Sequence, residues 1–185
     1  SILVNLIVKI MNKKVLLIDI DPQANATQGI GIDRLKMNGS IYDLIVNESE
    51  ITDVILKSNV PNLDVVPSSI DLAGADLELA EVKIGRERRL KEQLALIRDN
   101  YDYLLIDCPP SLGLLNTNAL TASDTVIIPV QCEYYALEGL TQLLSTIRLT
   151  QQVFNPSLSI EGVLLTMLDQ RTNLGIEVSQ EVRKY

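Results

Sequence analysis

The sequence predicts an α/β fold in three layers, with a mainly parallel sheet and helices on both of its faces. Short runs of branched aliphatic residues recur along the 185-residue chain, and segments with helical spacing of apolar residues lie between them. Hydrophobic residues make up 46% of the chain and aromatic residues only 4%, so the core must be aliphatic, as buried parallel strands require. The length is that of one ordinary domain, and we expect a single domain over residues 1–185.

Composition and charge exclude several kinds of site. The formal net charge is −8, so the overall balance does not indicate a surface for nucleic acid or for an anionic membrane. There is no histidine, and the two cysteines, Cys108 and Cys132, are far apart, which argues against a zinc site or a His-dependent triad and favours reduced thiols. No apolar run reaches the roughly 18 residues of a membrane-spanning helix. We therefore expect a cytoplasmic protein without a membrane span.

The first predicted strand is the apolar run Val15–Ile18. It leads into Asp19, Asp21 and then Pro22, a residue that cannot continue a strand ladder. Before it, Ser1–Met11 is apolar from its first residues and has no capping residue, as in the interior of a helix. The last residues also stop within an amphipathic pattern. We expect the chain to be truncated at both ends.

Further strands and helices alternate along the rest of the chain. The expected strands are 63–67, 103–109, 125–130 and 160–167, and the expected helices are 40–45, 51–56, 74–101 and 138–154. Within 74–101 we expect a break at Gly85 and a solvated face at Arg86–Arg89. The residues that recur there at helical spacing, and so should form the apolar face, are Leu77, Ala80, Ile84, Leu90, Leu94 and Ile97. This alternation favours a parallel sheet with right-handed crossovers.

Acidic residues follow three of the predicted strands. Asp21, Asp107 and Asp169 each stand at the carboxyl end of a different strand, and in an open α/β sheet those ends lie at one edge, where ligands bind. Such carboxylates commonly hold Mg²⁺ through waters and substrate phosphates. The alternative is that each aspartate only caps the next helix. Because prolines follow both Asp21 and Asp107, we favour function, and the residues alone predict a phosphate or metal site.

Four segments resemble one known family. They are Val15–Thr27 (VLLIDIDPQANAT), Val66–Glu78 (VPSSIDLAGADLE), Asp102–Asn118 (DYLLIDCPPSLGLLNTN) and Ile127–Leu140 (IIPVQCEYYALEGL). Together they resemble the ParA/Soj chromosome- and plasmid-partitioning ATPases, which belong to the deviant Walker group of P-loop NTPases with MinD and the nitrogenase iron protein. The resemblance covers essentially the whole chain. It implies an ATPase that dimerises on Mg-ATP and drives DNA segregation with a ParB-like centromere-binding partner that stimulates hydrolysis.

The resemblance also implies roles for individual residues at the predicted acidic edge. Asp107 would be the Walker B carboxylate that holds Mg²⁺ through water, and Asp21 the switch I acid that positions or activates the attacking water. Asp19 would support Asp21 near the metal, with Asn25 close behind. An acid for water and metal, together with cationic donors for the phosphates, would suffice for phosphoryl transfer, which is mostly positioning and charge neutralisation.

A second set of implied residues would contact the nucleotide. Residues 108–113 would form switch II, in which Pro109, Pro110 and Gly113 let the backbone report the γ-phosphate. Met167, at the end of the last predicted strand, would lie near the adenine. For the segment Gln131–Gly139, packing in the core or at an interface is at least as good an interpretation as direct chemistry.

The sequence departs from the family pattern in one respect. The family places a glycine-rich loop of the form K-G-G-V-G-K-T before the helix that corresponds to Ser1–Met11, and this sequence contains no such loop. Its lysines and backbone amides are the main phosphate-binding elements, so a chain that starts at Ser1 should bind ATP poorly. The C-terminal part that carries basic residues for non-specific DNA binding is missing as well. We therefore expect nucleoid association and DNA binding only through those missing parts.

Two alternatives stay open. A MinD-like positioning ATPase would need a C-terminal amphipathic helix that binds the membrane, and the segment Ile127–Leu140 favours partitioning instead. A catalytically silent scaffold is motivated by the missing glycine-rich loop.

Overall fold

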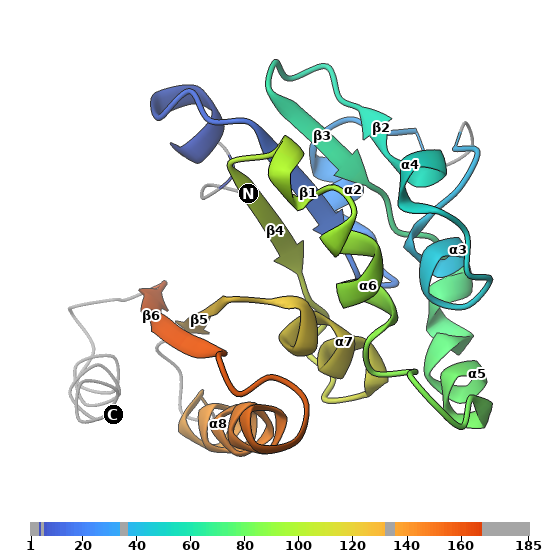
Figure 1. Cartoon of the computed structure of the whole chain (residues 1–185). Coiled ribbons are helices and arrows are strands. Elements are labelled where there is room, and N and C mark those ends of the chain that lie inside the picture. Colours follow the sequence, from blue (N-terminus) through green and yellow to red (C-terminus); the bar gives the residue numbers. More distant parts are fainter. Residues whose placement is uncertain (1–3, 5, 34–36, 132–135, 168–185) are drawn as a thin grey trace. The chain divides into compact units, whose positions relative to one another are not determined.

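A computed structural model describes residues 4, 6–33, 37–131 and 136–167 (Figure 1). Contacts divide the chain into two compact units, residues 1–122 and residues 123–185. The first unit contains a four-stranded sheet of order β2-β3-β1-β4, and the second contains a two-stranded sheet of β5 and β6. The α/β fold is confirmed. That residues 1–185 form one domain stays a prediction.

The first unit begins with a short π-helical segment and then alternates strands with short helices. Its strands are β1 (Val15–Asp19), β2 (Leu56–Lys57), β3 (Leu63–Val66) and β4 (Tyr103–Asp107). Its helices are η1 (Leu6–Ile10), α2 (Asn25–Gly29), α3 (Ile41–Ile45), α4 (Ile51–Val54), η3 (Ile70–Gly74), α5 (Ala75–Glu81), α6 (Arg89–Ala95), η4 (Arg98–Asn100) and α7 (Leu114–Ala122). The three strands predicted in this unit are confirmed, and each ends within two residues of its expected boundary.

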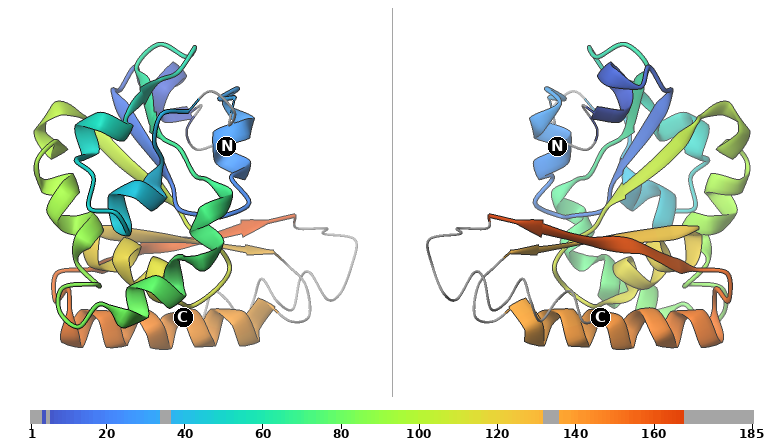
Figure 2. Two further views of the ribbon diagram at one scale, coloured as in Figure 1. Left: turned by 90° about the vertical axis from the view of Figure 1, so that its right-hand side faces the viewer. Right: turned by 90° about the vertical axis from the view of Figure 1, so that its left-hand side faces the viewer.

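Strand β1 is the centre of the first sheet. It pairs in parallel with β3 on one side and β4 on the other, with Val15 opposite both Leu63 and Tyr103. Because successive side chains of a strand point to opposite faces, Val15 and Leu17 enter one core cluster, and Leu16 and Ile18 enter another. Helices η1 and α2 cover the first face, and α3, α5, α6 and α7 cover the second (Figure 2). The predicted three layers are confirmed in this unit.

The region predicted as one helix over 74–101 is two helices with an irregular connection. Gly85 has a φ of +80°, a conformation that other residues rarely adopt, and the predicted break there is confirmed. The first half of the predicted apolar face is wrong, because Leu77 of α5 is 79% exposed and Ile84, which follows α5, is 90% exposed. The second half is confirmed, because Leu90, Leu94 and Ile97 are buried. Helix α5 follows the 3₁₀ turn η3, which sets its rotation, and the fully buried residues here are Leu72, Ala75 and Leu79.

Arg89 contacts the end of a neighbouring helix. Its guanidinium donates hydrogen bonds to the backbone oxygens of Ile45 (2.9 Å) and Val46 (3.1 Å) and pairs with Glu48 at 2.6 Å. Carbonyls at the end of a helix lack intrahelical partners, so this side chain completes the C-terminus of α3. The interpretation of Arg86–Arg89 as only a solvated face is therefore wrong at Arg89.

Helix α7 was not predicted from the sequence. Its residue Asn118 is fully buried and donates hydrogen bonds to the backbone oxygens of Arg86 (2.7 Å) and Leu114 (3.1 Å), and it accepts one from the Leu90 amide (3.3 Å). Such a side chain joins α7 to the start of α6. The stretch LLNTNA contains three polar residues, so the sequence of this helix does not show a regular spacing of apolar residues.

The second unit consists of β5 (Thr125–Gln131), α8 (Ala136–Val153) and β6 (Ser159–Thr166). The two strands pair in parallel, and α8 buries Leu140 and Ile147 as its apolar spacing predicted. Asp169 lies outside the described residues, so its predicted convergence with Asp21 and Asp107 stays a prediction. Among the helices of the described residues, none is long and apolar enough to cross a membrane.

Candidate functional site

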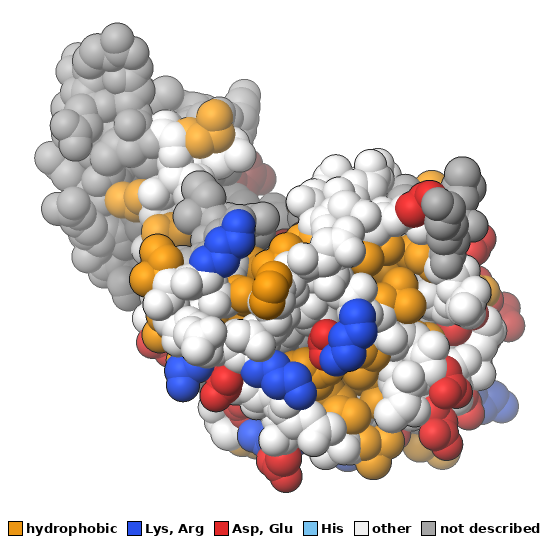
Figure 3. All heavy atoms as spheres, turned by 90° about the horizontal axis from the view of Figure 1, so that it is seen from above, with side chains coloured by type: hydrophobic (Ala, Val, Ile, Leu, Met, Phe, Trp, Pro, Cys, Tyr) orange, Lys and Arg blue, Asp and Glu red, His pale blue; other side chains and the backbone are white. Residues whose placement is uncertain are grey.

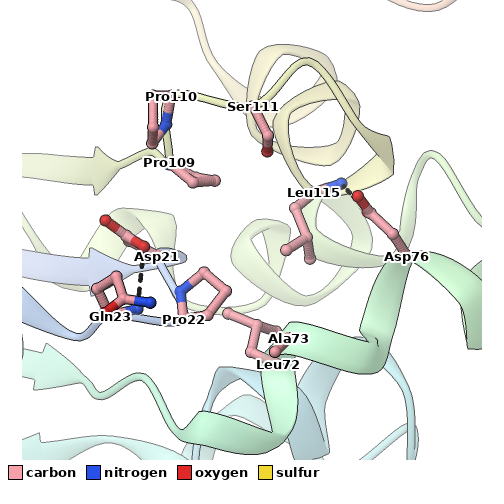
Figure 4. A pocket seen from close by; sticks show the side chains of 10 residues that line it. All are labelled: Asp21, Pro22, Gln23, Leu72, Ala73, Asp76, Pro109, Pro110, Ser111 and Leu115. Carbon is pink, nitrogen blue, oxygen red and sulfur yellow. Dashed lines mark hydrogen bonds between the residues drawn. The ribbon is translucent and has the colours of Figure 1, made fainter.

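A shallow pocket of about 360 Å³ lies where β1 and β4 end (Figure 4). Its walls come from the connections after β1 and β4, from η3 and α5, and from the first turn of α7. The lining residues are Asp21, Pro22, Gln23, Leu72, Ala73, Asp76, Pro109, Pro110, Ser111 and Leu115. The predicted site residues Asp21, Pro109 and Pro110 therefore meet at one pocket.

Asp19 is fully buried at the end of β1. Its Oδ2 accepts hydrogen bonds from the Thr27 amide and the Thr27 hydroxyl, both at 2.7 Å, and its Oδ1 accepts one from the Asp21 amide at 3.2 Å. Because Thr27 lies in the first turn of α2, Asp19 caps that helix. The contact of Asp19 with a nucleotide stays a prediction.

A hydrogen-bonded chain holds the backbone of Asp21. The Thr27 hydroxyl accepts a hydrogen bond from the Ser68 amide at 3.0 Å, and the Ser68 hydroxyl donates one to the Asp21 carbonyl at 2.6 Å. Ser68 and Thr27 are both fully buried. Ala24, which follows in the same loop, has a φ of 55°, a conformation unusual for alanine. The loop after β1 is therefore held in one shape by buried polar contacts.

The carboxylate of Asp21 faces the pocket (Figure 4). Its Oδ1 accepts a hydrogen bond from the Gln23 amide at 3.0 Å, and the side chain remains partly exposed. One oxygen is thus engaged in the turn. The carboxylate can accept a further hydrogen bond from a ligand or water in the pocket.

Asp107 ends β4 directly beside Asp19, its register partner on β1. Partial desolvation, followed by the negative charges of Asp19 and Asp21, raises the pKa of the Asp107 carboxyl above its ordinary value. A bound cation would relieve this repulsion, so the donor set fits a divalent metal. In the described part of the chain, no group of three or more acidic, cysteine or histidine side chains is placed to hold a metal ion by itself.

Neutralising Asp107 should stabilise the metal-free protein. A carboxyl whose pKa is raised by folding destabilises the fold at pH values above that pKa, and this cost disappears as the pH falls through it. We expect Asp107→Asn to raise the melting temperature at about pH 7 in the presence of a chelator, with a smaller gain at about pH 4. The control is Asp53→Asn, on the exposed face of α4. A lower melting temperature for Asp107→Asn at both pH values would contradict this expectation.

The segment between β4 and α7 is held by side chains from two helices. Asn116 of α7 is buried, and its Nδ2 donates hydrogen bonds to the backbone oxygens of Pro109 (3.0 Å) and Ser111. Asp76 of α5 lies against Gly113, where an added Cβ would overlap its Oδ2. The predicted switch segment 108–113 is therefore fixed from both sides.

Two predicted residues are not among those that make these contacts. Asn25 is exposed at the start of α2, and Met167 is 76% exposed after β6 in the second unit. Their proposed contacts with the nucleotide stay predictions, as do the roles of Asp19, Asp21, Asp107, Pro109, Pro110 and Gly113.

Sequence reasoning missed four polar residues that shape the site, Thr27, Ser68, Asp76 and Asn116. All four lie in segments that carry the family resemblance, which is the signal that could have found them. Each is a short polar residue of a kind that also occurs in turns and caps. Only the fold brings each one to its partner.

Removing the Thr27 hydroxyl should destabilise the protein. Thr27→Val keeps the shape of the side chain but leaves the buried Asp19 carboxylate and Ser68 amide each short of a partner. We expect a loss of about 1–3 kcal/mol in the free energy of unfolding, measured by urea denaturation. Thr27→Ser, which keeps the hydroxyl, is the control. A Thr27→Val variant within about 0.5 kcal/mol of the wild type would show that the network contributes little.

Comparison with known proteins identifies the family. The family model described as an AAA domain matches residues 1–160. The sporulation initiation inhibitor protein Soj of Bacillus subtilis is 60% identical over 175 residues, which cover 95% of this chain and 69% of Soj. The chain belongs to the ParA/Soj family of partitioning ATPases. The chromosome partitioning protein ParA of Myxococcus xanthus is a further family member, 49% identical over 94% of this chain and 61% of that protein.

Solved structures of similar proteins have the same fold. A plasmid partition protein from Borrelia burgdorferi is 30% identical, with a TM-score of 0.77 over 95% of this chain and 74% of that protein. Cobyrinic acid a,c-diamide synthase from Mycobacterium smegmatis, solved with an ATP analogue and magnesium, is 38% identical, with a TM-score of 0.88 over 96% of this chain and 72% of that protein. The ParA/Soj-like fold expected from the sequence is confirmed. This chain spans about two thirds of the length of its curated ParA/Soj relatives.

Proposed function

We propose that this chain is the main part of a ParA/Soj partitioning ATPase that binds Mg-ATP, dimerises on binding it, and drives DNA segregation with a ParB-like partner. The observation that carries the proposal is the cluster of Asp19, Asp21 and Asp107 at the carboxyl ends of β1 and β4, where desolvation and then the like charges of Asp19 and Asp21 raise the pKa of Asp107. The ATP analogue and magnesium bound by the Mycobacterium smegmatis neighbour support the choice of ligand.

The carboxylates of Asp107 and Asp21 would have different roles in ATP hydrolysis. Asp107 would hold Mg²⁺ through water, and the metal would neutralise phosphate charge when bound. Asp21, braced by Ser68 and the Gln23 amide, would accept a hydrogen bond from the attacking water and orient it. The segment 108–113 would exclude bulk water from one side of the pocket. Because this chain spans about two thirds of the length of its curated relatives, we assign the activity to the full-length protein.

Two lysines at the opposite end of the first sheet have carboxylate partners. Figure 3 looks onto the end where the parallel strands begin, and basic and acidic side chains stand next to each other there. Lys57 pairs with the buried Asp64 at 2.7 Å, and Lys13 lies 3.6 Å from Asp102. Lysines that already have carboxylate partners gain less from DNA phosphates. This supports our expectation that non-specific DNA binding uses other parts of the full-length protein.

The test is ATP binding and hydrolysis by the full-length protein, alone and with its ParB-like partner and DNA. We expect Mg-ATP binding in the range of about 1 μM to 1 mM, slow turnover that the partner stimulates, and a dimer in the presence of a non-hydrolysable analogue and Mg²⁺. Binding without turnover, even with partner and DNA, would favour the silent scaffold. Dimerisation that requires a lipid surface would favour the MinD-like alternative.

A further inference from the structure

We propose that Asp76, in the first turn of α5, is a positioning residue that holds the segment 108–113 in place relative to Asp21. This inference deepens the proposed function, because the positioned groups are those assigned to ATP hydrolysis. It is carried by two contacts of one carboxylate, one to Leu115 and one against Gly113. The resemblance assigned no role to this residue.

The first contact fixes the start of α7. Oδ1 of Asp76 accepts a hydrogen bond from the Leu115 amide at 3.0 Å (Figure 4). Amides in the first turn of a helix have no intrahelical partner, and a negative charge there is favourable. A carboxylate from α5 thus completes α7, and α7 begins directly after the segment 108–113.

The second contact explains the glycine at position 113. A Cβ on Gly113 would overlap Oδ2 of Asp76, so any other residue here would force this carboxylate to move. Gly113 is not among the residues with positive φ. Close approach to the Asp76 carboxylate, rather than an unusual conformation, therefore favours glycine here.

Asp76 belongs to a segment that also holds the other side of the pocket. Ser68, at the start of this segment, donates a hydrogen bond to the Asp21 carbonyl, and Leu72 in its middle is fully buried in the core. Residues 68–76 therefore connect the Asp21 loop to the segment 108–113 across the floor of the pocket (Figure 4). This segment therefore contacts both walls of the pocket, at Asp21 and at the start of α7.

The test compares Asp76→Ala, Asp76→Asn and the control Glu81→Gln in the full-length protein. Glu81 is an exposed acid at the end of the same helix. We expect Asp76→Ala to lower kcat roughly tenfold or more with a small change in KM for ATP, because small misplacements of reacting groups are costly in rate. Asp76→Asn keeps an oxygen for the Leu115 amide and should restore most of kcat. Equal kcat values for Asp76→Ala and Glu81→Gln would overturn the proposal, as would an Asp76→Asn variant no more active than Asp76→Ala.

A double-mutant cycle with Gly113→Ala tests the second contact. In the wild-type background the new methyl group overlaps Asp76, and we expect kcat and the melting temperature to fall. In the Asp76→Ala background the methyl group has room, so the further loss should be at least about threefold smaller in kcat. An equal penalty in both backgrounds would overturn the proposal. If the wild-type protein did not hydrolyse ATP, the proposed function would fail, while coupling in melting temperature would still report the contact.

Discussion

ATP turnover by the full-length protein should fall by about 100-fold or more in Asp21→Ala, while Mg-ATP binding and ATP-dependent dimerisation persist. The carboxylate faces the pocket and is proposed to orient the attacking water, and a positioned acid or base commonly contributes about 10²–10⁴ in rate. Single-turnover hydrolysis measures the loss. A nucleotide titration and a sizing column measure the functions that should remain.

A second variant separates the chemistry of Asp21 from its role in the loop. In Asp21→Asn the amide oxygen can still accept the hydrogen bond from the Gln23 amide, so the turn should keep its shape. We expect this variant to be as inactive as Asp21→Ala. Asp53→Ala, on the exposed face of α4, is the matched control and should hydrolyse ATP normally. Normal hydrolysis by Asp21→Asn would show that Asp21 only shapes the loop.

Asp107→Ala should weaken nucleotide binding only when Mg²⁺ is present. A carboxylate that holds a metal through water typically contributes about 10- to 100-fold to metal affinity, and we expect a loss of that size for Mg-ATP. Without Mg²⁺ the variant should bind ATP at least as well as the wild type, because one negative charge near the phosphates is gone. Titrations with Mg²⁺ and with a chelator measure both quantities. Unchanged affinity for Mg-ATP would show that Asp107 does not hold the metal.

The strands were predictable because each is a short run of branched residues with a clear end. Asp-Pro and Val-Pro stop β1 and β3 where the sequence predicted, and the spacing of Leu140 and Ile147 located α8. The two-residue strand β2 is too short for any periodicity to show. The apolar face of α5 was misassigned because the turn η3, which the sequence pattern does not reveal, sets the rotation of that helix.

The acidic residues of the site were predictable because they follow strands. The residues that hydrogen-bond to their loops were not predictable. Thr27 and Ser68 are 41 residues apart, and Asp76 and Leu115 are 39 residues apart. No local pattern records such a pairing, because it depends on how β3 and α5 are brought beside β1 and α7. Sequence reasoning could state where the carboxylates lie. It could not state which neighbours hold the loops that carry them.

A crystal structure of the full-length protein with a non-hydrolysable ATP analogue and Mg²⁺ tests the central claim most directly. We expect the γ-phosphate to lie at the carboxyl ends of β1 and β4, with Asp21 facing it and Mg²⁺ linked to Asp107 through water. The segment 108–113 should contact the phosphate while Asp76 keeps its hydrogen bond to Leu115. A γ-phosphate and metal bound away from Asp21 and Asp107 would contradict the account.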